Sequence, residues 1–569
     1  MTSGGAAKGM TPRRGRKDVE EHSRLDVVAF IDPSVAPHPS AHDSARPRFG
    51  AFRAQWSLLK ALASQTDSVA LTLVSTPEGE KRLDESARHW LGAPVRTINY
   101  LQLPTLTIDS SRTIIHHVGQ VFDQAPYAIR SALGRRIPVT SNHHSLGYSH
   151  LLQAASVLNR VEAQPKDAII ASSPHARQVL EWMIDAAAPE WPGSIPVIPL
   201  PVEGRPPTIP ERVAARERFG LRPDDITILS LGRLSRSDKA TLEPLLWSFA
   251  EICQGTGAAA RLMIVGDDSS GYAAELSREA QLFGIAERVQ ILADVDDDVR
   301  TQSLWAADIF VGLFDSHQEA FGLTVGEAQM AGLPCLVSDY SGVGTLIRDG
   351  VTGIALPTTH LRSDRLEDMW RHLLTWEADH LHHAQLVRVD RRALSNGLRA
   401  LVEHPEHRRR TATAAREHAL TQFAPRSIAE QYVSLWRRGG ERTPADRFPT
   451  GEPSARESRV GPFQSFASQV LDPSMYLVAW QPHQRFKVTD LIDNVISDLP
   501  GAGVIERCAR VLASNGSYVQ PHELAQAAGV SDDATLLAIA ILSKYGYVEF
   551  IPRGSPGCGG GPIDRRLLT

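Results

Sequence analysis

The chain has 569 residues, of which 42% are apolar and 22% are charged, a composition close to that of ordinary soluble globular proteins. This length gives room for two to four domains, and the composition excludes a fully disordered, collagen-like or disulfide-scaffold protein. The 60 Lys and Arg residues oppose 65 Asp and Glu residues, for a formal net charge of -5. That balance argues against a protein whose main role is to coat nucleic acid or an anionic membrane.

The predicted elements begin after residues 1–24, which are rich in Gly, Thr and Arg and are expected to form a disordered tail. Residues 25–205 alternate short β-rich runs with amphipathic stretches. This alternation predicts a parallel sheet covered by helices on both faces. The predicted strands are 25–31, 68–75, 95–100, 112–119, 137–144, 167–173 and 195–200.

A proline-rich hinge near residues 200–212 separates this half from a second α/β series over 206–438. The second series ends in helical text, and its last helix, near 428–438, is expected to pack back on the first domain. The predicted strands are 225–234, 260–268, 288–294, 307–314, 333–339 and 350–357.

Residues 439–462 hold four Gly and four Pro, too many for a packed element, and are predicted to be a linker. Residues 463–569 contain three helical runs and then the strand-like run 547–551, which predicts a small winged-helix-like module. Between Ile505 and Arg553 this module has four basic and five acidic residues. It therefore lacks the basic footprint that phosphate contacts require, and a protein-binding or acceptor-presenting role is expected for it.

The cellular compartment is predicted from the cysteines and the apolar runs. The four cysteines are scattered and form no Cys-x-x-Cys pair, so a reducing cytoplasm is expected. The sequence contains no uninterrupted run of about 18 apolar residues, so no membrane-spanning helix is expected. The basic residues near the N-terminus are not followed by an apolar stretch, so no secretory signal is expected there.

Residues 307–342 are the most informative stretch. An apolar strand runs into a polar loop that contains Glu319, and Thr324 is expected to be the N-cap of the helix that follows. The free amides and the dipole of a helix that begins at the end of a parallel strand favour an anion, so a diphosphate is a natural ligand. The small residues Ala320 and Gly322 let the backbone come close to that ligand.

Two carboxylates flank this helix start, and both have simpler interpretations. Thr324-Val-Gly-Glu327 has the form of a capping box, which would make Glu327 a structural residue. Glu319, taken alone, is typical of a surface loop acid. Carboxylates also suit sugar and ribose hydroxyls, because each accepts two O–H hydrogen bonds.

The string Glu319-Ala-Phe-Gly-Leu-Thr-Val-Gly-Glu327-Ala-Gln-Met-Ala-Gly-Leu-Pro resembles the signature of the retaining glycosyltransferases of family 4, also called group 1. In that signature two Glu are separated by seven residues, and the preceding run 306–311 also fits it. The resemblance spans roughly residues 25–437 and is strong from about 226 to 357. It implies a GT-B fold, in which two doubly wound Rossmann-like domains, here 25–205 on the acceptor side and 206–438 on the nucleotide-sugar side, face a cleft.

The resemblance implies that the chain is a hexosyltransferase-type enzyme. It would move a sugar from a nucleoside diphosphate to an acceptor hydroxyl with retained anomeric configuration. The donor would be a nucleotide sugar, and the acceptor a saccharide, lipid or small molecule. No nucleic acid, at most peripheral membrane contact and, for the C-terminal module, a protein partner are expected.

The resemblance also carries roles to individual residues. Glu319 would hold the sugar hydroxyls and steady the positive ring carbon, and His143 or His144, whose registry leaves the choice open, would face the donor sugar. Arg233 and Lys239 would take the leaving diphosphate, whose extra negative charge fixed cations can stabilise without a metal or a cofactor. The other expected diphosphate contacts are Phe321, Gly322, Leu323 and Thr324, and the expected ribose and nucleotide contacts are Glu327, Gly266, Asp267 and Val295.

Several features depart from the family pattern or invite another interpretation. Ala320 replaces a usual Gly, Thr345 replaces an acid, and the Gly-Gly loop after the first strand is missing. His116 and His117 end another strand and are second-rank candidates. The acids of 294–299 suit a divalent cation, although a helix start also needs acids.

Two other functions are alternatives to sugar transfer. Glycoside hydrolysis needs two carboxylates but gives Arg233 and Lys239 no role. A DNA- or protein-binding regulator, built on the C-terminal module with a degenerate transferase domain, is the alternative from a different class.

Overall fold

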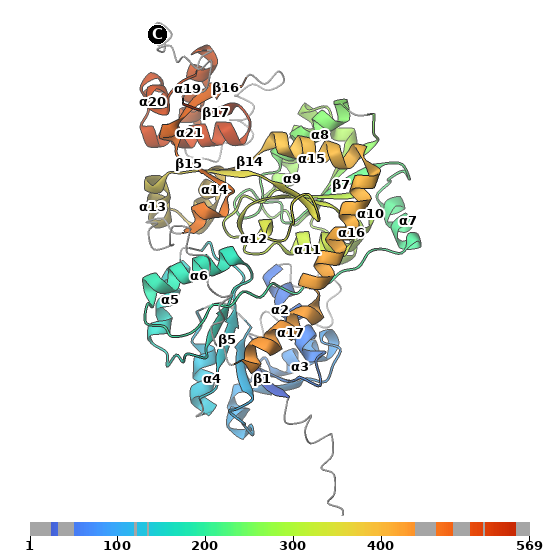
Figure 1. Cartoon of the computed structure of the whole chain (residues 1–569), viewed down its shortest axis with the longest axis vertical. Coiled ribbons are helices and arrows are strands. Elements are labelled where there is room, and N and C mark those ends of the chain that lie inside the picture. The colour runs from blue at the N-terminus through green and yellow to red at the C-terminus, as the bar shows by residue number, and fades with distance from the viewer. Residues whose placement is uncertain are drawn as a thin grey trace, which may run out of the picture.

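The computed structural model describes residues 24–31, 50–118, 122–133, 136–148, 150–255, 257–438, 462–481, 501–515 and 518–553. Residues 1–23 of the predicted tail, most of the loop that lacks the Gly-Gly pair and residues 439–461 of the predicted linker lie outside these ranges. The described residues form two parallel six-stranded sheets covered by helices, with a smaller body at one end of the molecule (Figure 1).

The first sheet is built from apolar runs, most of whose residues are buried. Its spatial order is β3-β2-β1-β4-β5-β6, and every neighbouring pair is parallel. Its strands are β1 (Leu25–Phe30), β2 (Val69–Ser75), β3 (Arg96–Asn99), β4 (Thr113–His117), β5 (Val139–Asn142) and β6 (Ala168–Ile170).

The predicted strand over 195–200 is wrong. That segment makes only isolated bridges beside β6, Ser194 with Ala168 and Val197 with Ala171. Pro196 and Pro199 lack the N–H that a continuous ladder needs, so pairing stops there and the sheet ends at β6.

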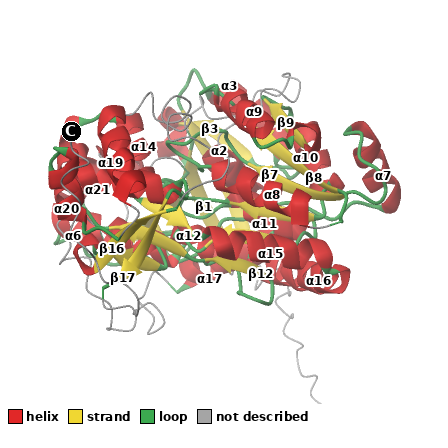
Figure 2. Cartoon of the chain, turned by 90° about the horizontal axis from the view of Figure 1, so that it is seen from above, coloured by secondary structure: helices red, strands yellow, loops and turns green. Residues whose placement is uncertain are grey.

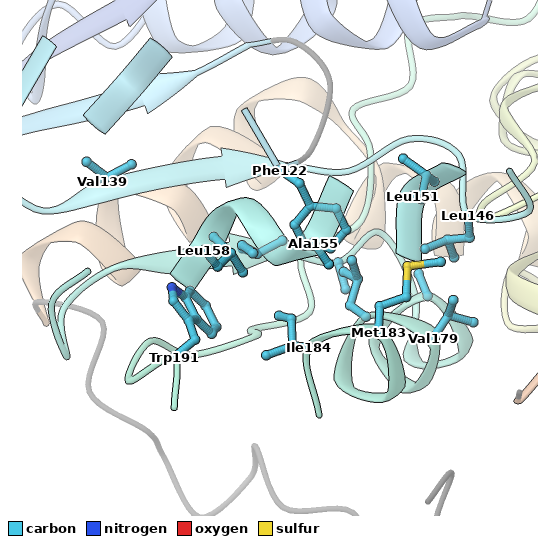
Figure 3. Packing of buried hydrophobic residues seen from close by; sticks show 14 of the residues in the cluster. Phe122, Val139, Leu146, Leu151, Ala155, Leu158, Val179, Met183, Ile184 and Trp191 are labelled. Atoms are coloured by element: carbon cyan, nitrogen blue, oxygen red, sulfur yellow. The ribbon is translucent and has the colours of Figure 1, made fainter. Parts of the chain in front are cut away.

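Helices cover both faces of the first sheet. They are α2 (Gly50–Ala63), α3 (Glu80–Trp90), α4 (Ala125–Leu133), α5 (His150–Ala155) and α6 (Pro174–Ala187), with the 3-10 turns η3 (Tyr100–Thr105) and η4 (Ser156–Asn159). Figure 3 shows part of the core, where Phe122 lies between a strand of the sheet and the Met183 and Ile184 side chains of α6. Ser173 caps α6 by accepting a hydrogen bond from the Ala176 amide, and Pro174 supplies the fixed φ of the first turn.

The second sheet has the spatial order β12-β11-β10-β7-β8-β9 and is also parallel throughout. All six strands expected in this half are present. They are β7 (Ile226–Leu231), β8 (Ala260–Gly266), β9 (Val289–Ala293), β10 (Ile309–Gly312), β11 (Cys335–Ser338) and β12 (Gly353–Leu356). Since β7 and β10 are neighbours, the strand order reverses between them, and the loops after these two strands open the crevice where ligands bind in such sheets.

The helices of the second sheet are α7 (Ile209–Arg218), α8 (Glu243–Gly255), α9 (Tyr272–Leu282), α10 (Asp297–Ala306), α11 (Leu323–Met330), α12 (Ser341–Gly344) and α15 (Arg391–Glu403), with the 3-10 turn η5 (Ala286–Arg288). From these, α16 (Pro405–Gln422) and α17 (Pro425–Arg437) lead back along the molecule to the first sheet (Figure 1). There α17 packs against α2, and its Ile428, Tyr432 and Trp436 are buried in the same core cluster as the side chains of α2.

An insertion follows β12 that the sequence analysis did not predict. It comprises β13 (Thr358–Leu361), α13 (Asp364–Leu373), α14 (Trp376–Gln385) and β14 (Val387–Val389). The strand β13 pairs with β14 on one side and, on the other, with β15 (Gln469–Leu471), which lies beyond the predicted linker. The C-terminal part of the chain therefore packs against this insertion.

We call β16, α19, α20, α21 and β17 the C-terminal unit. The predicted order of three helices and a strand is present as α19 (Ala502–Asn515), α20 (Pro521–Ala528), α21 (Asp532–Lys544) and β17 (Val548–Pro552). The strand β17 pairs with β16 (Tyr476–Trp480), a strand that was not predicted. The 3-10 turns η8 (Pro462–Phe466) and η9 (Pro473–Met475) precede β16 in the chain. Figure 2 places this unit at the end of the molecule opposite α7.

A helix that spans a membrane must be both long and apolar. None of the described helices is, by itself, long and apolar enough to cross a bilayer. Only α20 and α21 together reach that length and composition, and a bend of 108° separates them.

Candidate active site

Lys239 and Glu319 come together at the point where the strand order of the second sheet reverses. Lys239 lies in the loop after β7, and Glu319 lies in the loop between β10 and α11. The two side chains form an ion pair and are about one fifth and one eighth exposed, respectively. The Lys239 ammonium also lies 5.9 Å from the centre of the Phe314 ring. Two of the residues that the sequence predicts for sugar and diphosphate binding are therefore side by side.

The first domain holds the Glu319 loop from the opposite side. Ser145, which follows the two candidate histidines, pairs with Glu319 through an antiparallel bridge. The hydroxyl of Ser173 donates to the Ala320 carbonyl at 2.8 Å, and the Ser341 hydroxyl donates to the Glu319 carbonyl at 2.6 Å. Because these contacts hold the backbone of Glu319 and Ala320, the Glu319 carboxylate has a defined place between the two domains.

The helix start after this loop differs from the prediction. Gly322, not Thr324, is the N-cap of α11, and it has a left-handed φ of 97°. Glycine tolerates that conformation and turns the chain into the helix two residues earlier than Thr324 would. The amides of Leu323 and Thr324 belong to the first turn, so they have no acceptor within the helix.

Glu327 has a different set of partners from those of a capping box. Arg300 of α10 forms an ion pair with its Oε2, and Arg53 Nη2 of α2 lies 3.7 Å from its Oε1. The capping interpretation of Glu327 is therefore wrong, because Thr324 lies inside the helix. A pocket of about 190 Å³ opens here between α2 and α11, lined in part by Trp56, Lys60, Leu323 and Glu327.

Arg233 lies directly after Gly232 in the loop that follows β7. It forms an ion pair with Asp238, which lies five residues before Glu243, the first residue of α8. The turn after β8 lies beside it, since the Leu234 amide donates to the Asp267 carbonyl at 2.7 Å. Gly266 has a packing reason to be glycine, because a methyl group there would overlap the Gly232 carbonyl. The predicted nucleotide contacts Gly266 and Asp267 are thus adjacent to the predicted diphosphate contact Arg233.

The side chains of the other predicted donor contacts are less available. Phe321 is buried, and its ring packs edge-on against the Phe423 ring with the ring centres 5.7 Å apart, so its side chain is not open to a ligand. Leu323 approaches the N-terminus of α2, where its Cδ1 would lie 3.3 Å from a methyl group on Gly50. Val295 is partly buried and packs in the core that includes Leu304.

His143 and His144 both follow β5, next to Ser145. His143 is 2% exposed, and burial lowers its pKa to about 3. His144 is partly buried, lies 3.1 Å from the Asn142 amide nitrogen through its Nε2, and has a pKa lowered by burial to about 4. Both imidazoles are therefore neutral near pH 7.

The second-rank histidines occupy structural positions. His116 Nδ1 lies 2.9 Å from Thr140 Oγ1, and its ring packs edge-on against Tyr432 and Trp436 of α17. His117 lies 3.3 Å from Asp123 and is stacked on Phe30. These contacts tie β4 to its surroundings within the first domain.

The acids of 294–299 lie at the start of α10. Asp296 is the N-cap and accepts a hydrogen bond from the Val299 amide at 2.7 Å. Asp297 pairs with Arg53 at 3.0 Å, and Asp298 pairs with Arg218 at 2.6 Å. The helix-start interpretation is confirmed, and within the described ranges no three His, Cys, Asp or Glu side chains are grouped to hold a metal ion.

Some contacts of the site were not predicted. They include Arg53 and Arg300 on Glu327, and Ser341 behind Glu319, where Thr345 closes the short helix α12 by donating to Gly342. Nothing local in the sequence identifies an arginine on α10 as a partner of a glutamate on α11. Only the spatial neighbourhood of the two helix starts reveals it.

Comparisons with known proteins bear on these residues. Residues 211–383 match the family described as Glycosyl transferases group 1. A D-inositol 3-phosphate glycosyltransferase of Nocardia farcinica is 36% identical over 149 residues, which are 25% of this chain and 32% of that protein. Its counterpart in Actinosynnema mirum is 32% identical over 178 residues, 30% of this chain and 42% of that protein. The chain thus spans about a third of the length of the curated relatives it matches.

The fold was compared with solved structures. A glycosyltransferase of Rickettsia africae superimposes with a TM-score of 0.50 at 12% identity, over 74% of this chain and 100% of that one. This likeness and the two doubly wound sheets confirm the GT-B architecture that the sequence predicts.

Proposed function

We propose that this protein is a glycosyltransferase that moves a sugar from a nucleoside diphosphate to an acceptor hydroxyl with retention of configuration. One observation carries the proposal: Lys239 and Glu319, from the loops after β7 and β10, meet beside the N-terminus of α11. A cation, a carboxylate and free helix amides at one point suit a ligand that joins a sugar to a diphosphate. The match of residues 211–383 to the group 1 glycosyltransferases supports the same function.

In this proposal the second domain binds the donor. Lys239 and Arg233 contact the diphosphate, together with the backbone amides of Leu323 and Thr324 at the start of α11. Glu327 accepts hydrogen bonds from the ribose hydroxyls, and the turn at Gly266 and Asp267 lies along the nucleotide. Arg300 orients Glu327, because its guanidinium forms an ion pair with one oxygen of that carboxylate.

Charge stabilisation at the leaving group supplies the main catalytic effect. When the bond between the anomeric carbon and the phosphate oxygen breaks, the diphosphate gains negative charge, and the side chains of Arg233 and Lys239 stabilise it. The acceptor oxygen bonds to the same carbon from the same face, and its proton goes to the departing phosphate oxygen. Glu319 steadies the positive ring carbon and holds the sugar hydroxyls while this happens.

The first domain completes the sugar side of the site. His143 or His144 would face the donor sugar, and either imidazole, neutral near pH 7, can both donate and accept a hydrogen bond. The acceptor enters mainly from this domain. Closure of the two domains around both substrates excludes water and so favours transfer over hydrolysis.

The alternative of a DNA-binding regulator is not favoured by the position of the C-terminal unit. Its last helix, α21, buries Ile539, Ile541 and Lys544 among its other residues and does not present them to a duplex. Arg388 of β14 donates to Ser543 at 2.7 Å, and Arg392 of α15 pairs with Glu549 of β17 at 2.9 Å. The unit is docked on the proposed donor domain.

A thermal-shift panel of UDP-, GDP- and ADP-sugars tests the proposed donor class. A nucleotide sugar present at 100 times its Kd should stabilise the protein by about 2.7 kcal/mol and so raise its melting temperature. The donor found this way is then offered acceptors, beginning with D-inositol 3-phosphate, the compound in the names of the curated relatives. A panel in which no nucleotide sugar shifts the melting temperature would contradict the proposal.

A further inference from the structure

The last residue of α21 extends from the C-terminal unit into the proposed donor domain. The Lys544 ammonium lies 2.7 Å from Asp315 Oδ2, and the side chains of both residues are at most 4% exposed. The same ammonium also donates to the Ala384 carbonyl at the end of α14. A buried lysine therefore joins three parts of the chain: the C-terminal unit, the insertion and the loop after β10.

Asp315 also forms a hydrogen bond with the loop that carries Lys239. Its Oδ2, which accepts from Lys544, also accepts a hydrogen bond from the Thr241 amide at 3.0 Å. Thr241 is two residues from Lys239, whose ammonium pairs with Glu319. Asp315 is itself four residues before Glu319. One carboxylate oxygen thus ties together both loops of the candidate site, and Lys544 neutralises and holds that carboxylate.

A buried ion pair of this kind has a large desolvation free energy. Removing an ammonium and a carboxylate from water costs several kcal/mol per ion, and packed apolar residues at the same positions are often equally or more stable. Burial accordingly raises the pKa of Asp315 and lowers that of Lys544, although each partner favours the charged form of the other. A fixed geometry at the loops that carry Lys239 and Glu319 is a function that an apolar pair could not provide.

We propose that Lys544 is a positioning residue for the transfer reaction: through Asp315 and the Thr241 amide it holds the loop that places Lys239. The inference rests on the proposed function of Lys239 as a contact of the leaving diphosphate. It assigns the C-terminal unit to the catalytic apparatus of this chain, as a part that completes the donor site from outside the second sheet.

Hydrogen exchange tests the positioning without requiring activity. In the full-length protein, Lys544→Met should speed exchange of the backbone amides of 235–242 at least ten-fold, with Thr241 among them. The matched control is Arg510→Met, which replaces an exposed residue of α19 that pairs with Glu506 of its own helix. Exchange of 235–242 that stays at the wild-type rate in folded Lys544→Met would overturn the proposal.

Lys544→Met leaves the Asp315 carboxylate buried without a partner and could lower the yield of folded protein. The double variant Lys544→Met with Asp315→Asn removes both charges, so no unpaired charge stays buried and the protein should be more stable than Lys544→Met. It should still exchange 235–242 faster than the wild type, because the link to the C-terminal unit is broken. Wild-type exchange in this stable double variant would count against the proposal in the same way.

A kinetic cycle tests whether Lys544 acts through Lys239. Lys544→Met should lower kcat at least ten-fold in the wild-type background but less than two-fold in the Lys239→Ala background, because the group that it positions is then absent. Equal losses in both backgrounds would show that Lys544 acts elsewhere. If the wild type neither binds a nucleoside diphosphate nor transfers sugar, the proposed function fails, while the exchange measurement still decides whether Lys544 orders this loop.

Discussion

Arg300 of α10 binds the carboxylate of Glu327 on α11, and Arg53 of α2 approaches the other oxygen of that carboxylate from the first domain. The carboxylate proposed to bind ribose is therefore oriented by one arginine of its own domain and approached by one from across the cleft. A carboxylate held by two cations has a defined orientation, in which its oxygens can accept hydrogen bonds from ribose hydroxyls.

This relationship predicts how Glu327 contributes to binding. Glu327→Gln should weaken a nucleoside diphosphate about ten-fold, since a charge-assisted hydrogen bond to ribose is lost. Inorganic pyrophosphate, which has no ribose, should bind Glu327→Gln and the wild type equally. Titration calorimetry with both ligands checks this. Equal weakening of pyrophosphate would place Glu327 at the phosphates and not at the ribose.

The close approach of two loops predicts a difference between neighbouring glycines. Gly266→Ala should destabilise the protein by more than about 3 kcal/mol, because its methyl group would overlap the Gly232 carbonyl and displace the loop of Arg233. Gly232→Ala is the matched control: a methyl group there meets nothing within 4 Å, so its cost should stay within about 1 kcal/mol. Melting temperatures of the two variants measure this, and a well-folded Gly266→Ala protein would contradict the packing role.

The corrected start of α11 predicts a small effect for Thr324. Because Gly322 is the N-cap, Thr324→Ala should change the free energy of unfolding by less than about 0.5 kcal/mol. Asp390 is a true N-cap, which accepts from the Ala393 amide at 3.0 Å, and Asp390→Ala should cost about 1 kcal/mol. Thermal denaturation compares them, and a Thr324→Ala loss as large as that of Asp390→Ala would restore the capping interpretation.

Buried histidines predict the acid sensitivity of the first domain. Burial lowers the pKa of His116 and of His143 to about 3, whereas an unfolded histidine has a pKa near 6.5. Between these values the unfolded state binds more protons, so the free energy of unfolding falls as the pH is lowered from 6.5 toward 3. At pH 5 each histidine contributes about 2 kcal/mol of this loss.

A substitution tests this pH dependence. His116→Asn should reduce by about one the number of protons taken up on unfolding between pH 4 and 6, as measured from the slope of the unfolding free energy against pH. Gln153→Asn, which changes an exposed residue of α5 that does not titrate, is the control and should leave the slope unchanged. An unchanged slope in His116→Asn would mean that this histidine is already charged in the folded protein.

The two sheets could be predicted because strands buried on both faces are continuous apolar runs. The insertion at 358–389 could not. Three of the four residues of its strand β13, Thr-Thr-His-Leu, are polar, and it is a strand because β14 and β15 pair with it. One of its partners, Ser468, lies 110 positions further along the chain. The local sequence does not indicate a pairing with residues so far along the chain.

The candidate site shows the same division. The spacing of Glu319 and Glu327 and the strand ends placed most of the predicted residues near one crevice, because parallel strands bring their carboxyl ends to one edge. Lys544 could not be predicted: it ends an apolar helix, where a basic residue is ordinary, and its partner Asp315 is 229 positions away.

The most direct test of the central claim is titration calorimetry of UDP, GDP and ADP into the wild type and into Lys239→Ala and Lys166→Ala. The account predicts that one nucleotide binds the wild type and that Lys239→Ala weakens it at least ten-fold with an unchanged melting temperature. Lys166→Ala, which removes an exposed lysine of the turn before β6 in the first domain, should weaken it less than two-fold. Equal affinity in the wild type and Lys239→Ala, or no binding of any of the three, would contradict the account.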